Sequence, residues 1–257
     1  MPTYRLTVAY DGTDFCGWQR QANGSSVQAA LEEALAKLCQ APVTCRAAGR
    51  TDAGVHALGQ TVSFRLERPG STFSTRSLVL GTNHYLPPSI AVQDAVQVPD
   101  EFDARHSASG KLYRYQIWTG VAASPLHRRT HWHVSRPLEL GAMREAAQLL
   151  TGRHDFRAFR AADCERQTTV RLMRRIEVLQ PAGAAEPVLH VEVDGTAFLK
   201  NMVRILVGTL VQVGKGKMSL EHVQRLLTSG DRTQAGPTAP AHGLILVRVH
   251  YGPREGA

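Results

Sequence analysis

The feature that most constrains the fold is an order of expected strands and helices that occurs twice along the chain. Strands are indicated where apolar and polar residues alternate, and helices where apolar residues recur every three or four positions. The first half gives the order β-α-β-β-α-β over residues 3–10, 27–38, 43–48, 58–66, 75–83 and 90–98. The second half repeats this order with one extra helix, over residues 113–117, 140–150, 171–179, 188–193, 198–210, 219–227 and 245–251.

Two units of this order predict an α+β protein made of two ferredoxin-like halves. Residues 1–105 are expected to form the first half and residues 106–257 the second. In each half, helices should cover one face of an antiparallel sheet. Two such sheets side by side would make an extended sheet with a helix-free face and a cleft between the halves, where a large partner could lie.

Residues at the expected helix ends support these assignments. Ser25 and Gln28 have the spacing of a capping box at the start of the first helix. Ser219 is a good N-cap for the helix over 219–227. Pro87 and Pro88 are expected to end the helix over 75–83.

The charge of the chain indicates an acidic partner. The 257 residues carry a net charge of +8 and give a pI of about 9.7. Nucleic acid is therefore the first candidate and an anionic membrane surface the second. The membrane is the poorer choice, because no apolar segment approaches the length of a spanning helix. Strand-like sequence directly after Met1 indicates no signal peptide.

The cysteines indicate a reducing compartment. They are scattered without any CxxC pair, at Cys16, Cys39, Cys45 and Cys164. This pattern argues against a zinc knuckle or a disulfide framework and fits the cytoplasm.

One loop places an acidic residue between two glycines. Asp52 lies between Gly49 and Gly54, and Arg50 precedes it by two positions. Strand-like sequence on both sides would hold this loop, and Arg50 is near enough in sequence to keep the carboxylate ionised. Spacing alone favours an Asx-turn with a surface ion pair, because Asp is common in glycine-rich turns.

Several short segments occur in the order and spacing of a known family. They are Tyr10-Asp11-Gly12-Thr13, Gly17-Trp18-Gln19-Arg20-Gln21, Gly49-Arg50-Thr51-Asp52-Ala53-Gly54-Val55-His56, Phe102-Asp103-Ala104-Arg105, Lys111-Leu112-Tyr113-Arg114-Tyr115, His154-Asp155-Phe156, Ala158-Phe159-Arg160, Phe198-Leu199-Lys200-Asn201-Met202-Val203-Arg204 and Thr238-Ala239-Pro240. Together they resemble the signature of the tRNA pseudouridine synthase A family. The resemblance covers nearly the whole chain, and one segment alone would be a weak signal.

The resemblance implies an enzyme that isomerises uridine to pseudouridine in tRNA, with the pseudouridine synthase fold. It implies Asp52 as the nucleophile, Arg204 as the arginine that pairs with it, and Arg50 as the residue that flips the target uridine out of its stack. It further implies that Tyr113 contacts the target base, and that the targets are positions thirty-eight to forty in the anticodon stem-loop. It also implies a homodimer.

Each of these residues has a simpler interpretation from the sequence alone. Tyr113 fits a core aromatic residue on an alternating strand. Arg204 falls in an apolar helix, where it would be buried against a carboxylate such as Asp52, or would extend its guanidinium to the surface. Arg50 fits a phosphate contact or a solvated charge.

Basic residues along the chain fit contacts to the backbone of a folded RNA. Lys111 and Arg160 belong to the matching segments and are expected to bind the substrate. Lys200 stands where many members of the family carry His, so an RNA contact there would differ.

The expected reaction exchanges a C–N bond for a C–C bond with no net redox change, so neither a cofactor nor a metal is expected. Two alternatives stay open. One is a non-catalytic RNA-binding module of two ferredoxin-like halves, although the aromatic RNP motifs are absent. The other is a metal-dependent hydrolase that uses His127, His131 and His133, of which the last two would point the same way on a strand.

Overall fold

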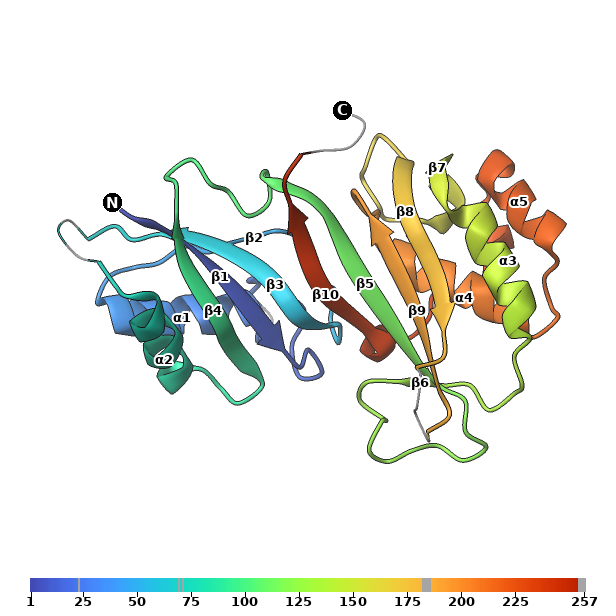
Figure 1. Ribbon diagram of the computed structural model, residues 1–257, viewed down its shortest axis with the longest axis horizontal. Coiled ribbons are helices and arrows are strands. Elements are labelled where there is room, and N and C mark those ends of the chain that lie inside the picture. The colour runs from blue at the N-terminus through green and yellow to red at the C-terminus, as the bar shows by residue number, and fades with distance from the viewer. Residues whose placement is uncertain (23, 69, 71, 182–185, 254–257) are drawn as a thin grey trace. The chain divides into compact units, whose positions relative to one another are not determined.

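Two compact units make up the protein in the computed structural model, which describes residues 1–22, 24–68, 70, 72–181 and 186–253 (Figure 1). The first unit holds Met1–Ser109 together with the chain from Leu246 onward, and the second holds Gly110–Ile245. Both boundaries fall inside strands, namely β5 (Ala108–Trp118) and β10 (Leu244–Tyr251). The division into 1–105 and 106–257 stays a prediction.

The first unit follows the predicted order of elements. Its elements are β1 (Thr3–Tyr10), α1 (Val27–Cys39), β2 (Arg46–Ala47), β3 (His56–Arg65), α2 (Thr75–Tyr85) and β4 (Ile90–Val98). The strands lie in the order β4-β1-β3-β10, and β2 pairs with β3. β1 runs antiparallel to both β3 and β4.

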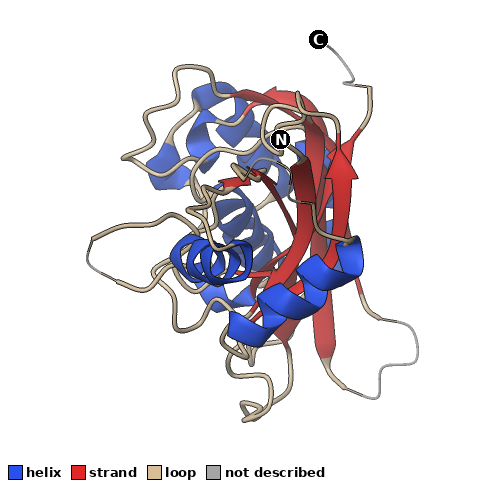
Figure 2. Ribbon diagram, turned by 90° about the vertical axis from the view of Figure 1, so that its left-hand side faces the viewer, coloured by secondary structure: helices blue, strands red, loops and turns tan. Residues whose placement is uncertain are grey.

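The alternation in β1 buries one face of this sheet. Tyr4, Leu6 and Val8 have no exposed surface, whereas Arg5 and Thr7 between them are half-buried. α1 and α2 pack against each other, and α2 also packs against β4. In the unit that faces the viewer in Figure 2, strands and helices form separate layers. The apolar core lies between these layers.

The second unit contains more elements than the first. They are β5, β6 (Trp132–His133), α3 (Leu140–Leu150), β7 (Gly152–Asp155), η1 (Arg157–Phe159), β8 (Val170–Leu179), β9 (Val188–Gly195), α4 (Met202–Gly214), α5 (Leu220–Ser229), η2 (Arg232–Gln234) and η3 (Ala241–Gly243). The strands lie in the order β5-β9-β8-β7. These pairs are antiparallel, and β6 pairs with β5 in parallel. α3 packs against α4, α5 and β8.

The predicted α+β class and its mostly antiparallel pairing are confirmed. The strands β1 and β4 and the helix α3 have the expected bounds, and Ser219 caps α5 by accepting a hydrogen bond from the His222 N–H, at 3.2 Å. One helix start and one helix cap were misplaced. α4 begins at Met202 and not at residue 198. The N-cap of α1 is Ser26 and not Ser25, because the Ser26 hydroxyl accepts from the Ala29 N–H.

Gln28 has a different role from the one that a capping box assigns it. Its side chain accepts from the Arg20 N–H at 3.0 Å and donates to Glu32 at 2.9 Å. The Gln28 side chain therefore links the first turns of α1 to the preceding loop.

None of the helices in the described part of the chain combines the length and the apolar character that a membrane span requires. All four cysteines are free. Cys39 and Cys45 are buried, and burial raises the pKa of both thiols.

Candidate active site

The Asp52 loop joins β2 to β3 and is held by its own main chain. The Val55 N–H donates to the Asp52 carbonyl at 3.1 Å, which closes a turn around Asp52. The Gln60 side chain on β3 donates to the Gly49 carbonyl at 2.9 Å. The Asp52 side chain is half-buried and Arg50 is exposed. The loop therefore presents a carboxylate on a fixed backbone.

Thr51 anchors the same loop to β1 and to the segment that follows it. Its carbonyl accepts from the Trp18 N–H at 3.1 Å. Its hydroxyl lies 2.8 Å from the Tyr10 hydroxyl at the end of β1. Burial raises the pKa of Tyr10 to about 12, so this phenol stays protonated even in moderately alkaline solution. These contacts fix the residue directly before Asp52.

Two glycines allow the segment over 11–18 to approach the Asp52 loop. Gly17 has a φ of +107°, and a Cβ there would lie 2.7 Å from the Thr51 carbonyl oxygen. At Gly12, a Cβ would lie 2.1 Å from the Val55 carbonyl oxygen. The Gly12 N–H also donates to Nδ1 of the buried His56, at 3.0 Å. Two backbone segments therefore touch on both sides of Asp52, which explains why the matching sequence segments contain these glycines.

Tyr113 lies in the core of the second unit. It is 8 % exposed, and its ring meets Phe198 edge to face with the centroids 5.0 Å apart. Lys111 lies two residues earlier on β5, so its side chain leaves the same face of the strand. Both the packing role and the substrate role of Tyr113 are compatible with this position.

Arg204 lies in the first turn of α4, and its guanidinium is held on two sides. Nε donates to the Ala239 carbonyl at 2.7 Å, and one terminal nitrogen donates to the Asn201 amide oxygen at 3.0 Å. The Ala239 N–H in turn donates to the Arg204 carbonyl at 3.1 Å. The side chain is half-buried. Asp52 belongs to the first unit and Arg204 to the second, so their pairing stays a prediction.

The segment around Ala239, whose carbonyl accepts from Arg204, is itself anchored. The hydroxyl of the buried Tyr115 donates to the Pro240 carbonyl at 2.7 Å, and burial raises the pKa of this phenol. A Cβ at Gly243 would lie 2.5 Å from the Tyr115 ring. β5 therefore carries both Tyr113 and the residue that positions the acceptor of Arg204.

Arg160 lies at the end of η1 and is half-buried. One terminal nitrogen donates to the Arg166 carbonyl at 3.3 Å. The N–H of Ala161 donates to the carbonyl of Lys200 at 3.0 Å. The Arg160 segment thus lies against the segment that leads into α4, although its expected role with substrate stays a prediction.

The three histidines of the metal alternative are each engaged with other groups. His127 contacts the Ser124 hydroxyl at 2.9 Å, His131 contacts the Thr130 hydroxyl at 2.9 Å, and His133 contacts the Gly120 carbonyl at 2.8 Å. Only His133 lies in β6, so the shared strand expected for His131 is not observed. Within the described ranges, no three His, Cys, Asp or Glu side chains are grouped to hold a metal ion.

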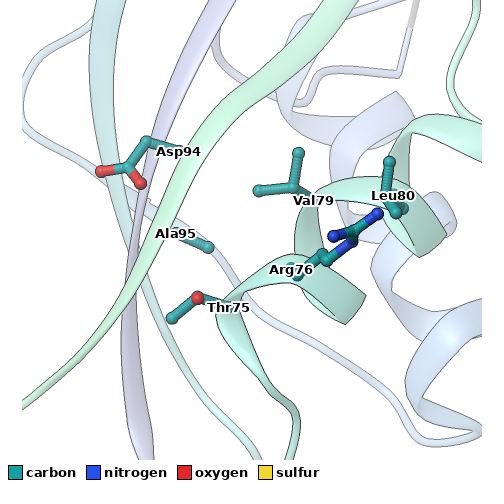
Figure 3. Close-up of a pocket in the computed structure, with 6 residues that line it drawn as sticks. All are labelled: Thr75, Arg76, Val79, Leu80, Asp94 and Ala95. Atoms are coloured by element: carbon teal, nitrogen blue, oxygen red, sulfur yellow. The ribbon is translucent and has the colours of Figure 1, made fainter.

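A pocket of about 340 Å³ opens between α2 and β4 (Figure 3). It is lined by Thr75, Arg76, Val79, Leu80, Asp94 and Ala95. None of the predicted site residues lines it, so this pocket is separate from the Asp52 loop.

Comparison with known proteins decides the family. A family model described as tRNA pseudouridine synthase matches residues 6–107 and 146–252. The chain belongs to the tRNA pseudouridine synthase family. Both matched stretches contain predicted site residues, since Arg50 and Asp52 lie in the first and Arg160 and Arg204 in the second.

Curated relatives of this family match nearly the whole chain. The tRNA pseudouridine synthase A of Syntrophotalea carbinolica is 50% identical over 99% of this chain and 98% of its own. That of Myxococcus xanthus is 49% identical over 98% of this chain and 92% of its own. That of Geobacter sulfurreducens is 47% identical over 98% of this chain and 100% of its own. The resemblance expected from the short segments is confirmed.

The sequence alone did not identify the residues that hold Arg204 and the Asp52 loop in place. Asn201 has a left-handed backbone, with a φ of 61°, and supplies the acceptor for Arg204. Thr51 and Gln60 hold the Asp52 loop through contacts that no spacing rule predicts. Asn directly before an apolar helix was the available signal for Asn201, because Asn tolerates the left-handed region better than most residues.

Proposed function

We propose that this protein converts uridine to pseudouridine in the anticodon stem-loop of tRNA, with the Asp52 carboxylate as the nucleophile. In this reaction the N1–C1′ bond breaks, the C5–C1′ bond forms, the proton on C5 leaves and N1 gains a proton. Atoms and electrons balance without a cofactor. The observation that carries the proposal is the half-buried Asp52 on a fixed loop, in a chain whose full-length relatives are named tRNA pseudouridine synthase A.

The other residues have roles that follow from the same resemblance. Arg204 pairs with Asp52, and the two hydrogen bonds that its guanidinium donates support a fixed orientation for this role. Tyr113 contacts the target base. Arg50 flips the target uridine out of its stack, and its exposed position supports contact with the RNA.

Substrate binding depends on basic residues and on more than one chain. Lys111 and Arg160 bind the RNA backbone, which the net charge of +8 favours.

The protein works in the cytoplasm as a homodimer on tRNA positions thirty-eight to forty. Light scattering tests the dimer, since a mass equal to that of one chain, 28.1 kDa, would contradict it.

The decisive experiment follows tritium at uridine C5 of an unmodified tRNA. The wild-type protein should release tritium with no added metal or nucleotide, and a chelator should not reduce the rate. Asp52→Asn should release tritium at the background rate and bind tRNA normally, because the carboxylate is lost while the loop backbone is retained. Asp94→Asn, an exposed residue on β4, is the matched control. Turnover by Asp52→Asn near the wild-type rate would remove Asp52 from the mechanism.

A further inference from the structure

The loop between η1 and β8 carries arginines in an unusual setting. The Phe156 N–H donates to the Thr169 carbonyl at 3.1 Å, which closes the base of this loop. Arg166 is exposed within the loop, and Arg171 is the second residue of β8, opposite His154 of β7. Both arginines therefore belong to one short hairpin-like connection.

The guanidinium of Arg171 has only some of its hydrogen-bond donors paired within the protein. One terminal nitrogen donates to the Val170 carbonyl at 2.7 Å. Its Nε is buried and has no hydrogen-bond partner among the residues that the structure describes. A buried donor without a partner is costly, so an orphan guanidinium nitrogen needs an explanation.

A second guanidinium adds like charge beside Arg171. Burial lowers the pKa of Arg171, the charge of Arg166 lowers it further, and Cys164 acts in the opposite direction. In the described part of the chain, neither Arg166 nor Arg171 forms an ion pair with a carboxylate. The exposed Arg166 and the half-buried Arg171 place two positive charges in one short connection, which attracts an anion.

Two other half-buried arginines of the same unit pair with carboxylates. Arg114 on β5 lies 2.7 Å from the Glu192 carboxylate on β9. Arg174 on β8 lies 3.3 Å from Asp194, also on β9. The rule that partly buried arginines are matched by carboxylates therefore holds for these two residues. Arg171, which is also half-buried, departs from it.

We propose that Arg166 and Arg171 form a subsite for one backbone phosphate of the RNA substrate. A phosphate accepts hydrogen bonds from several guanidinium nitrogens at once, so it would bridge Arg166 and a terminal nitrogen of Arg171. Drawing the Arg171 guanidinium toward solvent in this way would also end the burial of Nε without a partner. This inference rests on the proposed function, because RNA is the source of the phosphate.

The neighbours of the subsite connect it to the substrate residues of the same unit. Arg160 donates to the Arg166 carbonyl and so fixes the loop. Ala161 donates to the Lys200 carbonyl, and the Lys200 ammonium contacts Asp163. The phosphate would thus be bound next to residues 198–204. This segment contains Phe198, which packs on Tyr113, and ends at Arg204.

The test measures the affinity of an unmodified tRNA at several salt concentrations. The double variant Arg166→Gln/Arg171→Gln should weaken binding about tenfold at low salt and reduce the slope of log K against log salt by about one, since one phosphate contact is lost. The KM for tRNA should rise while kcat at saturating tRNA stays near the wild-type value. Arg76→Gln, an exposed arginine on α2, measures the effect of removing one charge outside the subsite, and twice this effect is the baseline for the double variant.

Three outcomes would overturn the subsite. An unchanged affinity and slope in the double variant would show that no phosphate is bound there. A slope reduced by two would indicate two separate contacts. A lower Tm for Arg171→Gln with unchanged affinity would give Arg171 a purely structural role. Absence of tritium release from the wild type would contradict the proposed function, while the binding measurement would still decide the subsite.

Discussion

At the scale of single residues, backbone atoms do most of the positioning. Asp52 lies in a turn closed by its own carbonyl, and Arg204 donates to the Ala239 carbonyl and to the Asn201 amide. Main-chain acceptors are supplied by the fold and do not depend on a particular side chain. Asn201 is the exception, because its amide oxygen holds one edge of the guanidinium.

Asn201→Ala should lower both the Tm and the rate of tritium release. Alanine in the left-handed region costs about 1 kcal/mol. Losing a hydrogen bond to a charged group costs about 1.5–3 kcal/mol. Because about 1.4 kcal/mol corresponds to a tenfold change in rate, the rate of tritium release should fall roughly 10- to 100-fold. Thermal melting and single-turnover kinetics measure the two effects separately.

The variant Asn201→Gly separates backbone strain from the lost amide. Glycine adopts the left-handed region freely, so the part of the Tm loss that comes from backbone strain should recover. The kcat should stay reduced, because the Asn201 amide oxygen that accepts from Arg204 is still missing. If kcat recovers together with the Tm, Asn201 acts only on the backbone.

At the scale of elements, the long alternating and amphipathic segments were predictable. β1, β4 and α3 have the expected bounds, because each has a single uninterrupted pattern. β7 was not predicted, since its four residues show no alternation and their strand character depends on pairing with β8. The candidate site residues, including Asp52 and Arg204, were predicted from short segments, and their roles stay predictions. Their supporting contacts were not predicted, because contacts such as Trp18 to Thr51 join segments that only the folded chain brings together.

Gly17→Ala should disrupt the support of the Asp52 loop. The positive φ and the contact of the new Cβ with the Thr51 carbonyl together should cost about 1–3 kcal/mol, and tritium release should fall as the loop shifts. Gly216→Ala is the matched control, because Gly216 also has a positive φ but a Cβ there meets no atom within 4 Å. Urea unfolding compares the two variants, and equal stability with full activity of Gly17→Ala would show that the close approach is dispensable.

At the scale of the whole molecule, the net charge is positive at neutral pH, and protonation of histidines makes it more positive at acidic pH. The chain carries a net charge of +8 with its 11 histidines neutral. Burial lowers the pKa of His131 from 6.5 to about 4, with smaller effects from His127, His190 and His242. The pKa of His190 is also lowered, first by burial and then by Arg114. The folded protein therefore resists protonation at these positions.

The stability of the protein should fall as the pH is lowered from 6.5 towards 4. The unfolded chain takes up a proton at His131 below pH 6.5, whereas the folded chain does so only near pH 4. The stabilisation is complete above pH 6.5 and is lost as the pH falls. The Tm of His131→Asn should depend less on pH in this window, and that of His84→Asn, an exposed residue on α2, should follow the wild type. Parallel Tm curves for wild type and His131→Asn would contradict the assignment.

The rigid attachment of Thr51 and Gly49 has a consequence for substrate choice. In the reaction proposed above, a nucleophile on a fixed backbone could not travel to its target, so the tRNA would have to deform to reach Asp52. Selection among uridines then follows the cost of unstacking each nucleotide, which is smallest where pairing is weak or the strand already bends. Sequence around the target would influence turnover through flexibility, even at bases that no side chain touches.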